Sequence, residues 1–351
     1  MRVIYPIIAL LLLSCGGEID RTVLIPDANG KPGNIQVLME TSLWDGPVGN
    51  EIRANFDQYA VGVYLRPEPS FEYYQIEPKK FNGTLRYSRN ILQIKLRKDT
   101  TYEKTTVTEY YDRYARGQLF IQIADSDPTR LLKFMKRDFP MVSETFNAYE
   151  TERLVKNYTK EHHKAIDEAA RNNMGVSVFL PKGTELKVEE KNFIWGKHDR
   201  SKNQIAGKDN RFEAGTYWIQ QGFLIWEVPY KDTAQLSPRG VLSERDTILK
   251  YHVPGKTEGS YMSTEYDPFY APEVKVLEYK GAYAVKVWGL WKHAGNETAF
   301  GGGPFIQLTV HHEARNSLVT VCGYIYAPKF DKKEYLREIE AVLETITLIE
   351  E

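Results

Sequence analysis

The sequence has very little cysteine, which limits how its fold can be stabilised. Only Cys15 and Cys322 occur among 351 residues. Cys322 lies in an alternating apolar run at 318–326 that is typical of a strand, where we expect a small buried side chain rather than a reactive thiol. If Cys15 is acylated, as argued below, no intramolecular disulfide can form. The stability of the fold must then come from buried apolar surface.

An excess of charge of one sign is also missing, and so are long hydrophobic runs. The chain carries 46 Lys and Arg against 47 Asp and Glu, a formal net charge of −1. Charges of both signs are interspersed, without the basic stripe that binds nucleic acid, so we expect no nucleic-acid partner. A helix that spans a bilayer takes about 20 apolar residues, and no run of that length occurs, so no membrane-spanning helix is predicted.

The one clear apolar run lies at the start of the chain. Arg2 precedes it, IIALLLL at 7–13 forms its centre, and Ser14 and Cys15 end it. A basic start, a short apolar centre and a small-residue exit are typical of a secretory signal peptide, here residues 1–14. The alternative is an ordinary signal peptide, or a poor membrane anchor, with an unmodified cysteine.

LLSC at 12–15 further resembles the bacterial lipobox, in which the signal is cut before a cysteine that carries lipid. The resemblance implies that Cys15 is the acylated N-terminus of the mature protein and that a lipid membrane is its partner. Two or three acyl chains on one residue meet the need for more than one anchoring signal. We therefore expect a lipid-anchored protein of the bacterial cell envelope, in the outer membrane on its periplasmic or surface face. Residues 15–33 are then the lipidated cysteine and a tether.

The length left after removal of the signal, 351 − 14 = 337 residues, predicts two domains. We place an N-terminal α+β domain at 34–173, and its expected elements follow. Strands are predicted at 35–39, 90–96 and 118–123, helices begin near a cap at Asp45 and at Asp127-Pro128, a loop runs through Pro78, and a long helix after a break at Pro140 covers about 141–173.

The C-terminal domain is predicted at 174–351. Its expected strands lie at 175–180, 193–195, 217–228, 283–291, 305–311 and 318–326, and its expected helices at 238–251, after Ser237, and from a cap at Asp331 to 346. Hairpin-like spacing of the last strands favours a mostly antiparallel sheet, and two amphipathic helices can cover it. The fold class is therefore α+β in two domains, the second an antiparallel sheet flanked by helices.

Six short blocks stand out along the chain. In order they are RNIL at 89–92, YHVPG at 251–255, EGSYM at 258–262, GLW at 289–291, GGPF at 302–305 and YAPKFD at 326–331. Together they resemble the signature blocks of a family of Bacteroidota lipoproteins with a domain-of-unknown-function label. That resemblance implies no activity, substrate or catalytic residue. The element order after 175 is also similar to PsbP-like α/β/α sandwiches, which implies topology only.

The histidines do not form a metal-binding pattern. They are His162, His163, His198, His252, His293, His311 and His312. Adjacent histidines point to different sides of a helix or strand, so neither adjacent pair chelates one ion alone. We expect 162–163 to be solvated on a surface helix and 311–312 to form the shoulder of a hairpin. No metal or organic cofactor is predicted, although convergence of His252, His293 and a carboxylate stays open.

Motifs for nucleophilic or phosphate chemistry are equally scarce. No serine lies in a Gly-X-Ser-X-Gly elbow, and GGGP at 301–304 lacks the Lys-Ser/Thr of a phosphate loop. Ser260 follows a Pro-Gly turn, where a hydroxyl usually bonds the local backbone. We therefore predict no catalytic residue.

Aromatic residues are the one compositional hint at function, with 23 Tyr and 6 Trp. Binding proteins use these rings as flat faces with a polar handle, which makes Trp288, Trp291, Tyr261 and Ser260 our candidate ligand contacts. Trp288 and Trp291 should face opposite sides of one strand. The alternative is that aromatic residues simply favour strands.

We expect a non-catalytic envelope protein that binds a ligand or partner, either an unknown envelope protein or a glycan. Two alternatives stay open. One is a hydrolase that acts on envelope glycan or peptide, and the other is an assembly factor for outer-membrane or secretion machinery.

Overall fold

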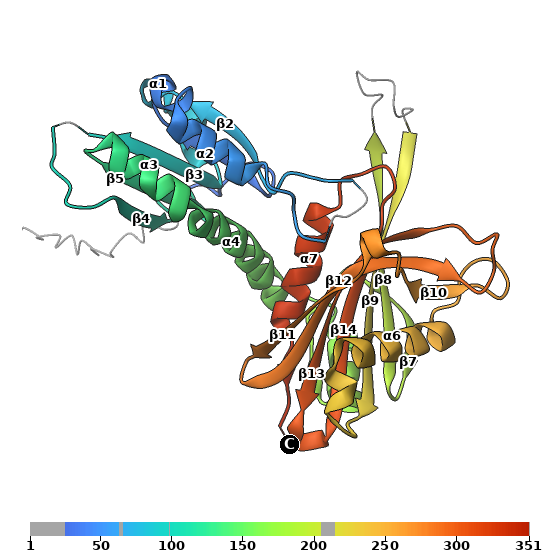
Figure 1. The fold of residues 1–351 in the computed structure, drawn as a ribbon. Helices are drawn as coiled ribbons and strands as arrows, with labels where there is room; N and C mark the ends of the chain where they lie inside the picture. Colours follow the sequence, from blue (N-terminus) through green and yellow to red (C-terminus); the bar gives the residue numbers. More distant parts are fainter. Residues whose placement is uncertain (1–24, 63–65, 98, 205–214, 351) are drawn as a thin grey trace, which may run out of the picture.

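The molecule has two parts, each built on its own β-sheet (Figure 1). The computed structural model describes residues 25–62, 66–97, 99–204 and 215–350. The predicted signal peptide at 1–14 and Cys15 lie outside these residues, as does most of the predicted tether. Within the described part of the chain, no helix is both long and apolar enough to cross a bilayer.

The first part is a five-stranded sheet in the order β2-β1-β3-β5-β4, in which only the β4–β5 pair is antiparallel. Its strands are β1 Asn34–Leu38, β2 Glu72–Ile76, β3 Asn90–Leu96, β4 Thr106–Tyr111 and β5 Leu119–Asp125, and its helices are α1 Thr41–Trp44, α2 Pro47–Phe56, α3 Pro128–Arg137 and α4 Phe139–Lys160. The central strands β3 and β5 are mostly buried, as parallel strands covered on a face by helices should be. Residues of α2, α3 and α4 complete that core, among them Ile52, Leu131 and Phe146.

Three predictions for this part are wrong. The loop expected through Pro78 contains β2, whose pairing partner β1 lies far away in the sequence. Asp45 does not cap α2, because it ends α1 and Gly46 stands at the N-cap position of α2. The tether is shorter than 15–33, because the backbone amides of Ala28 and Asn29 each donate to a carbonyl of the first part at 2.8 Å. The start of α3 is confirmed, since the Asp127 carboxylate accepts hydrogen bonds from the first turn.

The long helix expected over 141–173 is two helices. Pro140 lies in the first turn of α4, as predicted, but α4 ends at Lys160 and α5 Lys164–Met174 follows. Between them the backbone amide of His163 donates to the Leu180 carbonyl at 3.0 Å, and its ring Nδ1 accepts from the Ile166 amide at 3.2 Å. The chain therefore leaves the helix to pair with the second part.

The second part is an antiparallel sheet that includes the path β10-β12-β13-β14-β9-β8-β7, with β11 paired to β12. Its elements are β7 Glu185–Glu190, β8 Phe193–Gln204, β9 Gly215–Pro229, α6 Pro238–His252, β10 Tyr261–Thr264, β11 Glu273–Tyr279, β12 Ala282–Ala294, β13 Gly302–His312, β14 Ser317–Tyr326 and α7 Lys333–Thr345, with a separate pair of β6 Val176–Ser177 and β15 Thr347–Leu348. Short 3-10 turns occur at Pro78–Lys80, Gly83–Tyr87, Thr233–Leu236, Pro268–Tyr270 and Glu313–Arg315.

Helices cover both faces of this second sheet. Apolar residues of α5 and α7, such as Ile166 and Ile339, pack on one face, and those of α6, such as Leu249, pack on the other. Cys322 is fully buried on the α6 side, as expected of a small hydrophobic residue in a strand. The α+β class and the helix-flanked antiparallel sheet are thus confirmed.

The two parts meet at the start of α7. Asp331 does not cap this helix, contrary to our prediction. Instead the buried carboxylate of Glu68, from the segment before β2, accepts hydrogen bonds from the amides of Lys332 and Lys333 at 2.8–2.9 Å. Farther along, Arg337 Nη2 donates to Asn147 Oδ1 of α4 at 2.9 Å, and α4 and α7 run side by side (Figure 1).

Candidate functional site

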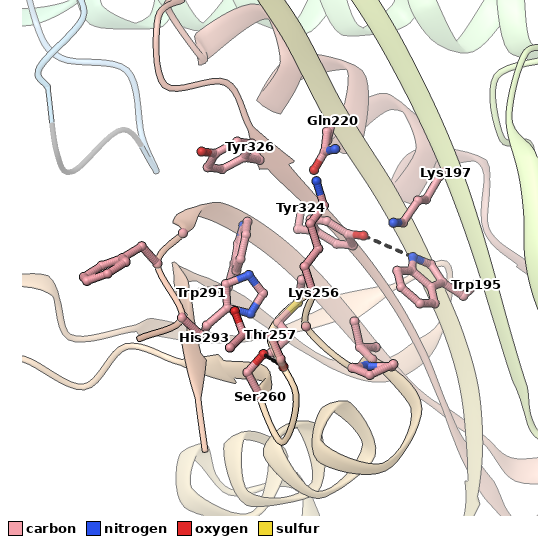
Figure 2. A pocket seen from close by; sticks show the side chains of 17 residues that line it. Trp195, Lys197, Gln220, Lys256, Thr257, Ser260, Trp291, His293, Tyr324 and Tyr326 are labelled. Carbon is pink, nitrogen blue, oxygen red and sulfur yellow. Dashed lines mark hydrogen bonds between the residues drawn. The ribbon is translucent and has the colours of Figure 1, made fainter. Parts of the chain in front are cut away.

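A pocket of about 160 Å³ opens on the α6 face of the second sheet. Strands β8, β9, β12 and β14 supply its walls, and the segments 253–260 and 299–301 close its sides (Figure 2). Its lining includes Trp195, Lys197, Gln220, Gly255, Lys256, Thr257, Ser260, Trp291, His293, Phe300, Tyr324 and Tyr326. The strand residues converge because positions two apart on a strand share a face, β14, β9 and β8 are neighbours in the sheet, and only β13 separates β12 from β14.

Aromatic rings form the wall of the pocket, and hydrogen bonds fix them. Trp195 Nε1 donates to the Tyr324 hydroxyl at 3.1 Å, and Trp291 Nε1 donates to the Ile325 carbonyl at 3.0 Å. Trp195 is 9 % exposed, and Trp291 and Tyr324 are each 5 % exposed. Since their polar atoms are already satisfied within the wall, the rings present mainly flat apolar faces to the pocket.

A glycine makes room for this wall. Gly222 on β9 pairs with Tyr324 on β14, and a Cβ at Gly222 would lie 2.2 Å from the tyrosine ring. No real Cβ tolerates that distance. The absence of a side chain at Gly222 therefore allows the Tyr324 ring to lie across the sheet toward Trp195.

The loop after α6 closes one side of the pocket tightly. The Ser260 hydroxyl donates to the Thr257 carbonyl at 2.6 Å, and the Gly255 amide donates to the Ser260 carbonyl at 2.8 Å. A Cβ at Gly255 would lie 2.1 Å from Ser260 Oγ and 2.9 Å from His293 Nδ1. Ser260 thus bonds its local backbone, as predicted, rather than His293.

The charges that line the pocket are all positive. Lys197 lies with its ammonium 4.6 Å from the centre of the Trp195 ring, and Lys256 extends from the loop toward the same end of the pocket (Figure 2). Among the described residues, the lining contains no Asp or Glu and neither lysine forms an ion pair. Burial lowers the pKa of Lys197, and the negative charge of Asp199 opposes part of that shift.

His293 contributes a covered ring nitrogen. Burial lowers the pKa of His293, which favours the neutral imidazole. Its Nδ1 atom is buried and has no hydrogen-bond partner among the described residues. The ring packs edge-on against Trp291, with 5.4 Å between the ring centres. The pocket therefore presents aromatic rings, two ammonium groups and an imidazole.

The structure brings two of the four predicted ligand contacts into this pocket, namely Trp291 and Ser260. Trp288 lies on the opposite face, as the three-residue spacing predicted, and its Nε1 donates to Glu340 of α7 at 3.1 Å. Tyr261 points toward Lys250 of α6 instead, with 5.6 Å from the ammonium to the ring centre. Whether any of the four contacts a ligand stays a prediction.

Several lining residues were missed from the sequence. Trp195 and Lys197 on β8 and Tyr324 on β14 line the pocket but are not among the four predicted contacts, although Tyr324 lies in the strand predicted at 318–326. The sequence did contain one usable signal. Tyr324 and Tyr326 are two residues apart on a strand, so both must lie on the same face of the sheet.

The histidines lie apart from one another. Among the described residues, no group of three His, Cys, Asp or Glu side chains is arranged to hold a metal ion. The His252 ring stacks on Phe193, and its Nδ1 atom lies 3.4 Å from Glu190 Oε2. His252 therefore does not converge with His293. His312 is the last residue of β13, as the hairpin prediction implied. Its Nε2 atom lies 3.1 Å from the Gly175 carbonyl oxygen.

The prediction that 162–163 is solvated on a surface helix is wrong. Both residues lie between α4 and α5. The His162 side chain is only 14 % exposed, and its ring stacks on Phe179 with 4.1 Å between the centres. Its Nδ1 donates to the Tyr158 carbonyl at 3.0 Å. Tertiary packing, which the local sequence does not reveal, accounts for the difference.

Comparisons with known proteins support a family without assigned function. The model of a domain of unknown function, DUF4837, matches residues 163–345, and that of a second, DUF8532, matches residues 28–159. No curated protein matches the chain.

Solved structures give only a distant likeness. The Saccharomyces cerevisiae Ran-binding protein Mog1p is 8 % identical with a TM-score of 0.29, over 50 % of this chain and 91 % of that one. A point mutant of Mog1 gives the same identity and TM-score, over 50 % and 92 % of the two chains.

Proposed function

The chain belongs to the DUF4837 family, and from that premise we propose that it is a non-catalytic ligand-binding lipoprotein of the bacterial cell envelope. Its ligand would be a small molecule held against Trp195, Trp291 and Tyr324. The expectation that the chain belongs to a family of unknown function is confirmed by the two family models. The envelope location and the lipid anchor rest on the lipobox at 12–15 alone.

The observation that carries the binding proposal is the preformed aromatic wall. The rings of Trp195, Trp291 and Tyr324 are held by hydrogen bonds to one another and to the backbone. Small-molecule sites are usually concave, mostly apolar and preformed, with a few polar groups that fix orientation. The wall and the lysines beside it match that description.

A retained-ligand experiment tests this proposal. The full-length protein is purified from its own membranes, and co-purifying small molecules are identified by mass spectrometry. In the variant Gln220→Trp an indole would fill the mouth of the pocket, and we expect it to lose the retained molecule. Val276→Trp, at a half-exposed position on β11, places an indole away from the pocket and should retain it. Equal retention by wild type and Gln220→Trp, or no retained molecule and no binding in a small-molecule screen, contradicts the proposal.

The anchor is tested separately. Replacing Cys15 by Ala should release the protein from the membrane fraction, because no other anchoring signal was found in the sequence. If Cys15→Ala stays with the membranes like the wild type, acylation is not its anchor. Metabolic labelling with a fatty acid provides a direct readout that does not depend on fractionation.

A hydrolase of envelope glycan or peptide is the second candidate, because Ser260 and His293 both line the pocket. The Ser260 hydroxyl donates to Thr257 rather than to His293, which favours binding over nucleophilic attack. Hydrolysis of a panel of envelope fragments that is lost in Ser260→Ala would support this candidate over ours.

A further inference from the structure

The charges beside the aromatic wall indicate what kind of ligand the pocket takes. Lys197 and Lys256 come from separate elements, β8 and the loop after α6, yet their side chains extend toward the Tyr324 and Gln220 end of the pocket (Figure 2). Among the described lining residues no carboxylate balances them. Two like charges that share one cavity repel each other, so an anion bound between them is stabilised.

The environment of Lys197 strengthens this argument. Its ammonium is half-buried against the Trp195 ring. Asp199 and Glu185 attract this charge, but both lie too far away to form an ion pair with it. A half-buried ammonium that has lost part of its hydration binds an anion more strongly than an exposed one does. Lys256 is exposed and adds a second charge at the mouth.

The size of the pocket limits the rest of the ligand. Its volume is about 160 Å³. An engineered apolar cavity of about 150 Å³ holds one benzene molecule. The pocket therefore holds a single ring, which the flat faces of Trp195 and Trp291 can contact, and anything larger must extend past the exposed Phe300 at the rim.

We propose that the ligand is a single ring that carries a carboxylate, with the ring against Trp195 and Trp291 and the carboxylate between Lys197 and Lys256. This inference rests on the proposed function, since it names the chemical class of the molecule that the pocket binds. An aromatic acid and a sugar acid share this chemistry.

The test compares acids with neutral molecules of the same shape. Binding to the full-length protein is measured by calorimetry for benzoate against benzamide, and for glucuronate against glucose, with acetate as the anion that has no ring. We expect at least one acid to bind about tenfold or more tightly than its neutral counterpart, because a hydrogen bond to a charged group is much stronger than a neutral one. Binding of benzoate would identify the ligand as an aromatic acid, and binding of glucuronate would identify it as a sugar acid.

Variants assign the effect to the pocket. Lys197→Gln should weaken binding of the acid about tenfold or more, and Lys256→Gln somewhat less because its ammonium is exposed to solvent. Lys275→Gln, on the outer strand β11, is the matched control and should bind as wild type does. Circular dichroism and a melting curve establish that each variant is folded.

Two results overturn the inference. If benzamide and glucose bind as tightly as the acids, the ligand need not be anionic, while the binding proposal stands. If no probe binds wild type at millimolar concentration, the single-ring anion is wrong, and the retained-ligand experiment then decides independently on the proposed function.

Discussion

Glu68 should be a principal contact between the two parts of the molecule. It lies on the segment that leads into β2, and it is only 2 % exposed. Its carboxylate accepts from the backbone amides of Lys332 and Lys333, the residues at which α7 begins. A helix leaves its first amides without intrahelical partners, so a side chain from elsewhere in the chain caps this helix.

Replacement of Glu68 by Ala leaves these two amides without their acceptor. Loss of an N-terminal cap costs about 1 kcal/mol, and a buried donor left unpaired costs about 1–3 kcal/mol. Both figures describe the same lost hydrogen bonds, and the amides are only partly buried, so we expect the free energy of unfolding to fall by about 1–2 kcal/mol. Glu68→Gln keeps one acceptor oxygen and should lose about half as much.

Urea unfolding monitored by tryptophan fluorescence measures this effect, because five of the six tryptophans, all but Trp44, lie in the second part with α7. The control is Glu72→Ala, an exposed carboxylate on β2, for which we expect a change within about 0.5 kcal/mol. A Glu68→Ala protein as stable as this control would refute the reasoning.

The pH dependence gives a second readout. Burial raises the pKa of Glu68, and the hydrogen bonds from Lys333 and Lys332 offset this only in part. The folded state therefore holds the proton more tightly than the unfolded state. This contribution to stability is complete below the unfolded pKa and is lost as the pH rises through the folded pKa. Glu68→Gln should lack that loss.

Two further predictions concern buried groups. Burial raises the pKa of Glu150, but Arg153, Arg89 and the hydrogen bonds from Asn90 and Gly33 together hold the pKa below its usual range. Glu150→Gln should cost about 3–5 kcal/mol at neutral pH, and the stability that wild type gains from the lowered pKa should be lost as the pH falls through the folded pKa; a urea titration at several pH values checks both. Gly222→Ala should displace the Tyr324 ring, cost about 1–3 kcal/mol in thermal unfolding and weaken binding in the pocket. Unchanged stability in either variant would contradict the packing described.

Strands with strong apolar patterns were predictable from the sequence. Those near 90–96, 118–123 and 318–326 are β3, β5 and β14, whose residues are mostly buried. The strands β4 and β7 lie at the edges of their sheets, where half or more of their residues are exposed and none is fully buried, so neither has the strong apolar pattern of a central strand. The parallel pairing of β1 with β2 and β3 depends on partners distant in the sequence, which no local pattern reveals.

The candidate site was only half predictable for a related reason. Trp288 and Trp291 looked equivalent in the sequence, and their opposite orientation follows from strand geometry. Which of the two faces the pocket depends on which side of the sheet α6 and α7 cover, and that is tertiary information. Lys197 gave no signal of its own, because its role arises only when β8 and the loop after α6 come together.

The segment 161–163 should mark the boundary of the second folding unit. The sequence placed this boundary at 173/174, at the end of one long helix. In the structure α5 packs on the second sheet, where Ile166, Ala170 and Met174 are fully buried with residues of β9, β13 and α7. We expect a fragment of residues 161–351 to resist limited proteolysis and to melt cooperatively.

A fragment of residues 175–351 is the matched comparison. It loses α5 and so exposes the apolar surface of the sheet that this helix covers, which should cost several kcal/mol, since complete burial of one large apolar side chain is worth about 1.5–3 kcal/mol. Thermal melts of the two fragments decide between the boundaries. If the fragment from 175 is as stable as the one from 161, α5 belongs with the first part, and the break after α4 is only a bend in the connection between them.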